Sequence, residues 1–382
     1  MSAIPAAARH SEPSVPANIE PRQLKSQSEF HRDASWSPMA VLEFGRFFHL
    51  FTSEANVRRV VTLVGLVVMG ALSMAVNGAQ PAAPRTKVRP IQRVKDNLYW
   101  IPGSDKNTYP IPGSGYDPVA RTLFSGGNTA VLVAESGVVL VDTMLPGSGA
   151  EILAQVRSVT DKPVTMIINT HTHFDHAGSN TEFPATVEFV AHENTRANMA
   201  KETCPPVTHC QAFKGDNVKY LPKRTFKDRL SLLSGKDRIE LYYFGRGHTN
   251  GDNWVVFPAV GTMHTGDMFQ RKNMPAIDVA NNGGDALEFS RTLNAAVSSI
   301  KGVQTIIAGH SPTLLSWNDF RAYTDYYAEF VATVQNAIKT RRSVEEAIVA
   351  YKPSDRFKNF ETDAERVKQI ATAIYAASKG SQ

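Results

Sequence analysis

The chain is most informative at Thr170-His171-Thr172-His173-Phe174-Asp175-His176-Ala177-Gly178, where four metal-capable side chains fall within six residues. The apolar segment 164–169 before this stretch predicts a buried strand. In an extended chain, residues i and i+2 point to the same side, so His171 and His173 can bind one ion while Asp175 and His176 turn toward a second. Imidazole and carboxylate suit Zn²⁺ and other borderline divalent ions. This spacing predicts a metal site in preference to a surface histidine cluster.

Three further candidate ligands follow predicted strands later in the chain. His248 stands in a Gly-His-Thr sequence, Asp267 in Thr-Gly-Asp, and His310 in Gly-His. The glycine beside each candidate permits a close backbone approach or a positive φ angle. Loops at strand ends are where a rigid scaffold usually displays functional groups, so these three residues are expected to join the first stretch.

The apolar patterning predicts strands that alternate with helices. Short β-branched or aromatic runs predict strands at 97–101, 128–134, 138–142, 164–169, 187–191, 239–244, 253–257, 263–266 and 305–308. Helical spacing predicts helices at 149–159, 193–201 and 285–300, and a helical region from residue 316 onward. This order predicts an α/β fold.

Composition and charge exclude several classes of protein. The 382 residues are 42 % hydrophobic and 20 % charged, which is an ordinary globular balance and excludes a wholly disordered or fibrous chain. The net charge is +5, and three of these charges fall within residues 1–87. The remaining body is nearly neutral, so the charge balance predicts no nucleic-acid partner. Two cysteines exclude a disulfide-dense scaffold and a cysteine-based zinc ribbon.

Residues 1–87 are predicted to be a disordered N-terminal region outside the fold. Arg58-Arg59 precedes an uncharged apolar run at 60–76 and small residues up to 79, a pattern typical of an export signal. The run is slightly shorter than the roughly 20 apolar residues of a membrane-spanning helix, and a retained membrane anchor is the alternative. A short Pro-rich linker follows at 80–84. We therefore expect an exported, periplasmic protein whose single domain spans residues 88–382.

The four motifs in this order, together with Val141-Asp142-Thr143, resemble the metallo-β-lactamase superfamily of two-metal hydrolases over residues 99–312. The resemblance implies an αββα sandwich, in which two mixed β-sheets are flanked by helices and the metals lie at one edge. It implies that Asp267 bridges two metals and that Asp142 is a buried carboxylate holding the ligand loops. The remaining ligands would be His171, His173 and His248 for the first metal, and Asp175, His176 and His310 for the second.

The same resemblance implies a reaction. Two zinc ions, with iron or manganese as alternatives, would activate a water molecule that attacks a carbonyl group of a small-molecule ester, thioester, lactone or β-lactam. Asp175 would also orient this nucleophile and carry its proton. Two other interpretations stay open, namely iron-dependent persulfide oxidation on the same fold and a non-catalytic periplasmic metal-binding module.

Two features point to different branches of the superfamily. Residues 247–256 and 282–286 are similar to segments of the zinc β-lactamases that use a cysteine ligand, and they make Asn282 a candidate oxyanion donor. A turn rich in asparagine and glycine is an equal alternative for Asn282. By contrast, Asp267 in place of the cysteine, together with His176, resembles glyoxalase II, the lactonases and exported hydrolases associated with quinoproteins.

The remaining candidates are given structural interpretations. Arg271 and Lys272 are predicted to form a solvated basic loop, with the binding of a substrate carboxylate as the alternative. Cys204 and Cys210 are predicted to form a small disulfide loop, as an oxidising compartment would allow. The oligomeric state is left open.

Overall fold

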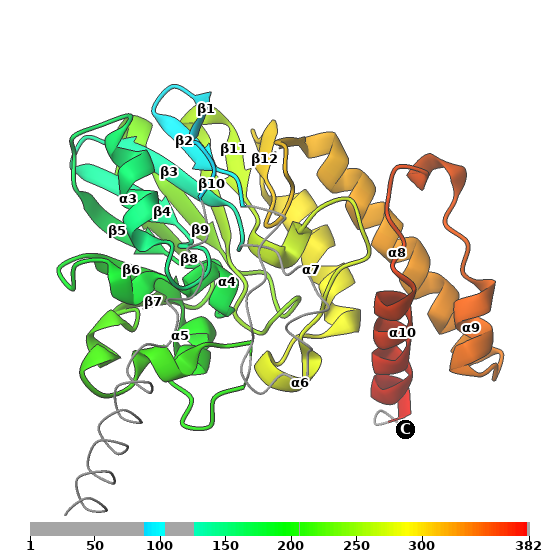
Figure 1. Ribbon diagram of the computed structural model, residues 1–382. Coiled ribbons are helices and arrows are strands. Elements are labelled where there is room, and N and C mark those ends of the chain that lie inside the picture. The colour runs from blue at the N-terminus through cyan, green and yellow to red at the C-terminus, as the bar shows by residue number, and fades with distance from the viewer. Residues whose placement is uncertain (1–87, 104–125, 206, 380–382) are drawn as a thin grey trace, which may run out of the picture. The chain divides into compact units, whose positions relative to one another are not determined.

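Two mixed β-sheets lie face to face in the computed structural model, which describes residues 88–103, 126–205 and 207–379 (Figure 1). These residues belong to one compact unit, Ala83–Gln382. The first sheet has the order β1 (Gln92–Lys95), β2 (Leu98–Ile101), β3 (Thr129–Ala134), β4 (Gly137–Val141), β5 (Val164–Ile168), β6 (Glu188–His192) and β7 (Arg224–Phe226). The second has the order β13 (Leu315–Ser316), β12 (Thr305–Ile307), β11 (Thr262–His264), β10 (Trp254–Phe257), β9 (Ile239–Tyr242) and β8 (Arg229–Leu232).

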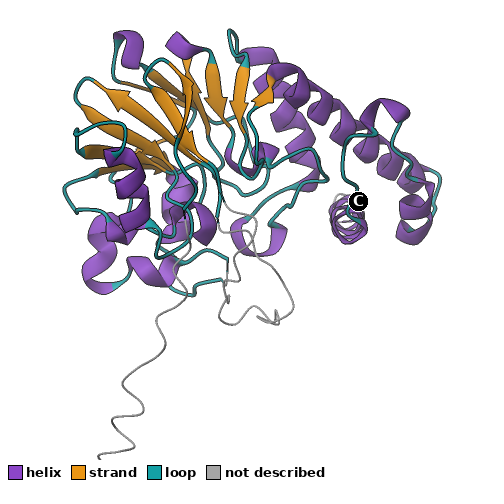
Figure 2. Cartoon of the chain, turned by 45° about the horizontal axis from the view of Figure 1, so that its top comes forward, coloured by secondary structure: helices purple, strands orange, loops and turns teal. Residues whose placement is uncertain are grey.

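Helices cover the outer faces of both sheets (Figure 2). The α-helices of the described part are α3 (Gly149–Arg157), α4 (Phe174–Ala177), α5 (Glu193–Met199), α6 (Val279–Asn282), α7 (Ala286–Ser299), α8 (Trp317–Lys339), α9 (Val344–Ala350) and α10 (Ala364–Lys379). Short 3-10 helices are η1 (Asn180–Glu182), η2 (Cys210–Phe213), η3 (Gly215–Tyr220), η4 (Gly235–Asp237), η5 (Pro258–Val260), η6 (Gly266–Phe269) and η7 (Asp355–Phe357).

Alternating strand side chains build the layers. In β10, Val255 and Phe257 face the other sheet, whereas Trp254 and Val256 pack against the helical layer of α7, α8 and α10. The outer face of the first sheet packs against α3 through Ile152. Because successive strand residues point to opposite faces, a strand that is apolar throughout contributes to two cores at once. The result is the expected αββα sandwich.

Strand direction brings the expected ligand segments to one edge. β10 runs antiparallel to both β9 and β11, and β12 runs parallel to β11, so β9, β11 and β12 all end at the same edge of their sheet. β4 and β5 are parallel in the other sheet. The backbone N–H of Asn253 donates to the carbonyl of Thr170 at 2.9 Å, which joins the end of β5 to the start of β10. Segments far apart in sequence therefore meet there.

The C-terminal region is helical, as predicted, but divides into three helices. Ser316 begins α8 with a capping box, because its side chain accepts from the Asp319 N–H and the Asp319 side chain accepts from the Ser316 N–H. The predicted apolar stripe of α8, which includes Phe320 and Phe330, is buried. Ser343 begins α9 with a second capping box, and Pro353 follows its end.

The interior strands, the helices α3, α5 and α7, and the C-terminal helices confirm the sequence predictions. The four-residue helices α4 and α6 were not predicted, and neither were four short strands. These are β1, β7, β8 and β13, which have two to four residues each. β1 is the polar sequence Gln-Arg-Val-Lys, which carries no apolar period. β1, β7, β8 and β13 are the edge strands of their sheets. Edge strands need few apolar residues, so pattern analysis does not reveal them.

The N-terminal predictions lie outside the described residues. They comprise the disordered region 1–87, the signal or anchor at 60–79 and the linker at 80–84. Among the helices that the structure describes, none combines the length and the apolar character that crossing a bilayer requires.

Because the two sheets pack face to face, shortening a side chain between them is expected to lower the stability of the fold considerably. Leu241 on β9 is fully buried in that core, so Leu241→Ala is expected to lower the free energy of unfolding by about 2–5 kcal/mol. Val349 on α9 is 76 % exposed, and Val349→Ala is expected to change it by less than about 0.5 kcal/mol. Denaturant titration of both variants measures the difference, and equal values would contradict the assigned core.

Candidate metal centre

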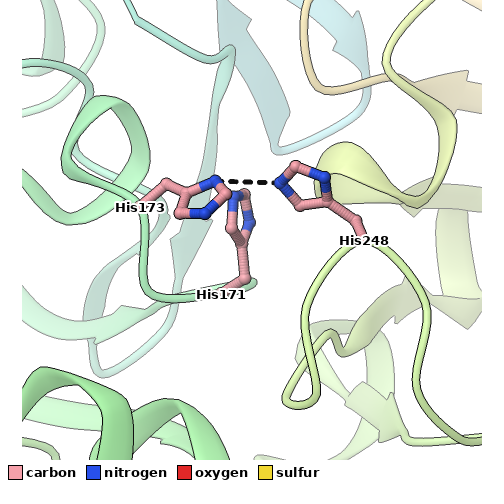
Figure 3. Close-up of side chains that lie close together, drawn as sticks. All are labelled: His171, His173 and His248. Carbon is pink, nitrogen blue, oxygen red and sulfur yellow. Dashed lines mark hydrogen bonds between the residues drawn. The ribbon is translucent and has the colours of Figure 1, made fainter. Parts of the chain in front are cut away.

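The stretch after β5 changes from extended chain to helix within four residues. His173 is extended, with φ −67° and ψ 149°, and it precedes α4, which contains Asp175 and His176. His171 and His173 lie in one group with His248, and Figure 3 shows their three rings turned toward one another. The predicted same-side placement of the first two histidines is thus present in the structure.

All seven candidate ligands come together at the sheet edge. They form three overlapping groups, within each of which the ligand atoms lie no more than 4.8 Å apart. The groups are His171, His173 and His248; His171, His176 and Asp267; and Asp175, His176 and His310. The shared members join the three groups into one continuous centre.

Hydrogen bonds on the outside of the centre fix the tautomers of two histidines. His173 Nε2 lies 3.0 Å from the Asp278 carboxylate, and His248 Nδ1 lies 2.8 Å from the carbonyl of Ala276. Both partners accept only, so each of these nitrogens carries a proton. The other two nitrogens, His173 Nδ1 and His248 Nε2, face each other at 2.9 Å (Figure 3). In neutral rings both are lone pairs, and a cation between them removes their repulsion.

His171 is oriented through a relay of side chains. The Thr170 hydroxyl donates to Asp142 at 2.7 Å, so it accepts from His171 Nδ1 at 3.0 Å. His171 Nε2 is buried and has no hydrogen-bond partner among the described residues. A buried nitrogen without a partner is costly unless something binds it, and a metal ion would satisfy this one.

Asp142 also orients His176. We call His171, His173 and His248 the first half of the centre, and Asp175, His176 and His310 the second half. The Asp142 carboxylate accepts from the Thr170 N–H at 2.8 Å and lies 2.7 Å from His176 Nδ1. Asp142 is fully buried and has a φ of 66°, an angle that aspartate tolerates better than most residues. With the proton of a neutral ring on Nδ1, the His176 Nε2 that faces the centre would be free to bind a metal, as in other metal sites whose ligands are oriented by a carboxylate.

Asp267 lies between the two halves. Its Oδ1 is 3.1 Å from His176 Nε2 and 3.2 Å from His310 Nε2, and its Oδ2 is 3.5 Å from His248 Nε2. Gln270 donates to Oδ2 at 2.6 Å and so fixes the carboxylate. A Cβ on Gly309 would lie 2.2 Å from Oδ1, so only glycine leaves room for this approach.

The pKa values of the histidines shift in opposite directions within the centre. Burial and the neighbouring imidazoles hold the pKa of His171 well below its usual value, and the same causes lower the pKa of His248. Burial also opposes charge on His176, but Asp267, Asp175 and Asp142 raise its pKa well above the usual value. The carboxylates thus favour positive charge at the shared side of the centre, while His171 and His248 stay neutral and able to bind metal.

A cavity of about 360 Å³ opens onto the centre. His173, Asp175, His248, Asp267 and His310 line its base. A substrate in this cavity would therefore meet ligands of both halves.

The Asn282 side chain is hydrogen-bonded within the protein, whereas an oxyanion donor would have to face the cavity. It is fully buried, and its amide nitrogen donates to Asp278 at 2.6 Å and to Thr208 at 2.9 Å. Asn282 is not among the cavity-lining residues. In this arrangement its amide holds Asp278, which in turn orients His173.

The two basic residues after Asp267 form ion pairs, and the two cysteines form a disulfide. Lys272 pairs with Asp319 at 2.6 Å. Arg271 pairs with Glu361 at 3.4 Å and also lines the cavity. Cys204 and Cys210 form the predicted disulfide. The backbone of the intervening loop touches the ligand stretch, because the Phe174 N–H donates to the carbonyl of Val207 at 3.0 Å.

Three residues of the site have no signal in the sequence. Asp278 and Gln270 orient ligands, and Arg366 lines the cavity from α10. Only Gln270 lies close to a motif, three residues after Asp267. The other two come from segments with no recognisable pattern.

Comparisons with known proteins agree with this geometry. The family model described as the metallo-β-lactamase superfamily matches residues 122–310, which include all seven candidate ligands. The chain is 25 % identical over 258 residues to the metallo-β-lactamase type 2 of Elizabethkingia meningoseptica, covering 65 % of this chain and 87 % of that one. It is 28 % identical over 163 residues to the 2,4-dinitroanisole O-demethylase subunit alpha of a Nocardioides strain, covering 39 % and 46 %.

A solved structure supports the fold. The metallo-β-lactamase from Pontibacter korlensis superposes with a TM-score of 0.50 at 17 % identity, covering 63 % of this chain and 99 % of that one. The chain belongs to the metallo-β-lactamase superfamily, a class of hydrolase-like proteins with a histidine-rich centre at one edge of an αββα sandwich.

The contacts of Asp142 predict a loss of metal affinity when its charge is removed. Asp142→Asn places an amide against the protonated Nδ1 of His176 or the N–H of Thr170, and it is expected to weaken metal binding by about 10- to 100-fold. Competition with a chromophoric chelator measures the affinity. Asp161→Asn, at an exposed aspartate before β5, is the matched control and should leave it unchanged. Equal affinities in the two variants would contradict the orienting role.

Proposed function

We propose that the protein is an exported hydrolase that uses two zinc ions to cleave a carbonyl bond in an ester, a thioester, a lactone or a β-lactam. One observation carries the proposal. Buried acceptor atoms of five histidines and two aspartates face one another around Asp267, which contacts both halves of the centre. Cations among these atoms would offset the repulsion of their lone pairs, and the contacts of Asp267 with both halves support two of them.

The donor chemistry fits this choice. Imidazole nitrogens and carboxylate oxygens, without a thiolate, suit zinc and leave iron and manganese as alternatives. His171, His173 and His248 would hold one ion, and Asp175, His176 and His310 the other. Bound there, the two ions would lower the pKa of a shared water and polarise the substrate carbonyl.

The protein groups have separate tasks in this reaction. Asp175 lines the cavity with its side chain 18 % exposed, and its Oδ2 lies 3.4 Å from His310 Nε2. Its exposure to the cavity supports a role in accepting the proton of the attacking water and passing it to the leaving group. Gln270 holds Asp267 in place, and Asn282 holds Asp278, so neither carboxylate has to reorganise during the reaction.

The complete second half of the centre favours hydrolysis over the alternatives. Persulfide oxidation uses one iron and needs fewer ligands, whereas Asp175, His176 and His310 are gathered within 4.8 Å of one another. A non-catalytic metal-binding module needs no cavity above its ligands, yet this centre opens to one. The two relatives named above act on different compounds, so the comparisons support a hydrolase-like site without selecting the substrate.

Export is part of the proposal. The pattern Arg58-Arg59, apolar run and small residues supports a signal segment at 60–79. The Cys204–Cys210 disulfide supports an oxidising compartment.

Metal analysis combined with a substrate panel tests the reaction. The chain, purified without a His-tag, is expected to contain two zinc ions and to hydrolyse a compound from a panel of β-lactam, lactone, thioester and phosphoester substrates. Asp267→Ala should lower kcat/KM by about 10²-fold or more, because both ions lose a ligand. Asp161→Asn is the control. Sulfur-dependent oxygen uptake with one iron, or full activity of His171→Ala, would refute the proposal.

Fractionation of cells that express the full chain tests the location. The protein is expected in the periplasmic fraction with its N-terminus after residue 79, as read by N-terminal sequencing. A membrane-bound product that retains residues 60–76 would support the anchor instead. A cytoplasmic product with reduced cysteines would contradict export.

A further inference from the structure

The loop closed by the Cys204–Cys210 disulfide contacts the neighbourhood of the metal centre through its backbone and through a buried side chain. The carbonyl of Val207 accepts from the Phe174 N–H at 3.0 Å, within the metal-binding stretch. The side chain of Thr208, the next residue of the loop, is fully buried. Both contacting residues lie between the two cysteines, so the disulfide encloses the part of the loop that meets the centre.

One amide side chain connects Thr208 to the carboxylate of Asp278. The Thr208 hydroxyl donates to Asn282 Oδ1 at 3.0 Å and accepts from Asn282 Nδ2 at 2.9 Å, and the same Nδ2 donates to Asp278 at 2.6 Å. Lys201 Nζ donates to Asn282 Oδ1 at 3.3 Å. An ammonium group only donates, so the amide oxygen faces Lys201 and the amide nitrogen is left for Asp278. We call Thr208, Asn282 and Asp278 the loop relay.

Asp278, the last member of the loop relay, contacts two of the three histidines in the first half of the centre. Its carboxylate lies 3.0 Å from His173 Nε2, and its backbone N–H donates to the carbonyl of His248 at 2.8 Å. The rings of these two histidines face each other (Figure 3). Partners behind a ligand set the orientation of its ring, so displacement of Asp278 would weaken metal binding in the first half.

The disulfide attaches the loop to a packed part of the protein. Cys210 is fully buried and begins η2. Phe213 of η2 packs with Ala177 of α4 and Met199 of α5 in one apolar cluster. The disulfide therefore joins Cys204 to this cluster. Without the cross-link, the segment between the cysteines would gain conformational freedom, and this entropy would oppose its contacts with the centre.

We propose that the Cys204–Cys210 disulfide strengthens metal binding in the first half of the centre, and that Thr208 transmits this effect as a positioning residue. A dithiol would reverse the effect. It transfers two electrons and two protons, so the Sγ–Sγ bond breaks to give two thiols and the dithiol becomes a disulfide. With the loop released, Asp278 loses part of its support and the histidines of the first half bind metal less tightly. The proposal rests on the metal binding of the proposed function but not on its hydrolysis.

The metal affinity of the centre would thereby follow the redox state of its surroundings. In an oxidising compartment the disulfide persists and the loop relay is held in place. A chain whose cysteines are still reduced before export would release the ion of the first half more easily than the exported chain.

Zinc titration of a variant without the disulfide tests the proposal on the full chain. Cys204→Ala combined with Cys210→Ala is expected to bind one of two zinc ions about 10-fold or more weakly than the oxidised wild type, because Asp278 is less firmly held. Competition with a chromophoric chelator measures the affinities, and thermal unfolding of the metal-free proteins measures folding. Equal affinities would refute the role of the disulfide alone. Failure of the oxidised wild type to bind zinc would refute the hydrolase function as well.

The redox equilibrium of the wild-type disulfide provides a measurement without any substitution. By linkage, zinc must favour the disulfide by the same factor by which the disulfide favours zinc. In a glutathione buffer, with free zinc held at saturation by a chelator, the disulfide is expected to become about 10-fold harder to reduce, or about 30 mV for a two-electron couple. Acid quenching, alkylation and mass spectrometry measure the reduced fraction. An equilibrium that zinc leaves unchanged would refute the proposal.

Substitutions at Thr208 separate the loop relay from a general loosening of the loop. Thr208→Val removes the hydroxyl at nearly constant volume, and it is expected to weaken the same zinc ion by about 3- to 10-fold through the loss of one hydrogen bond. Thr208→Ser keeps the hydroxyl and should bind zinc within about 2-fold of the wild type. Thr333→Val, at a half-buried threonine whose hydroxyl donates to a carbonyl of its own helix α8, is the control and should leave the affinity unchanged.

The Thr208 variants and the glutathione equilibrium also decide the proposal if the double cysteine variant does not fold. Wild-type zinc affinity in Thr208→Val would refute the loop relay.

Discussion

The structure depends on the mutual orientation of acceptor atoms around Asp267. His173 donates outward to Asp278, His248 to the carbonyl of Ala276, and His176 to Asp142. Each outward hydrogen bond leaves a lone pair that points inward, into a space where the His171 Nε2 is already buried without a partner. Like acceptors at such distances repel one another, so positive charge inside the centre would stabilise it. The two sheets and the loops at their edge hold these acceptor atoms together.

The ligand side chains are oriented by the positions of the strand ends, which come from both sheets, and not by the local sequence alone. β5 comes from one sheet, and β9, β11 and β12 come from the other. The backbone bond between Asn253 and Thr170 locks the two edges, and the space left by Gly309 lets Asp267 stand between the halves. The core between the sheets therefore has a functional role, because slippage of one sheet against the other would separate the ligands.

The region beyond the family match gives the cavity a chemical character of its own. Five of the candidate ligands line it, whereas further lining residues come from the segment after Asp267 and from α10. Arg366 adds a positive charge to this lining.

The sequence by itself determined the fold class, the interior strands and the identity of the candidate ligands. Those features are encoded in contiguous residues, such as the H-x-H-x-D-H stretch and the glycines beside Asp267 and His310. Only the tertiary structure decided the edge strands, the pairing of Asn282 with Asp278 and the place of Arg366. His173 and Asp278 are 105 residues apart, and Gln270 and Arg366 are 96 apart. No local pattern specifies such pairs, because they meet only through the packing of the two sheets and the C-terminal helices.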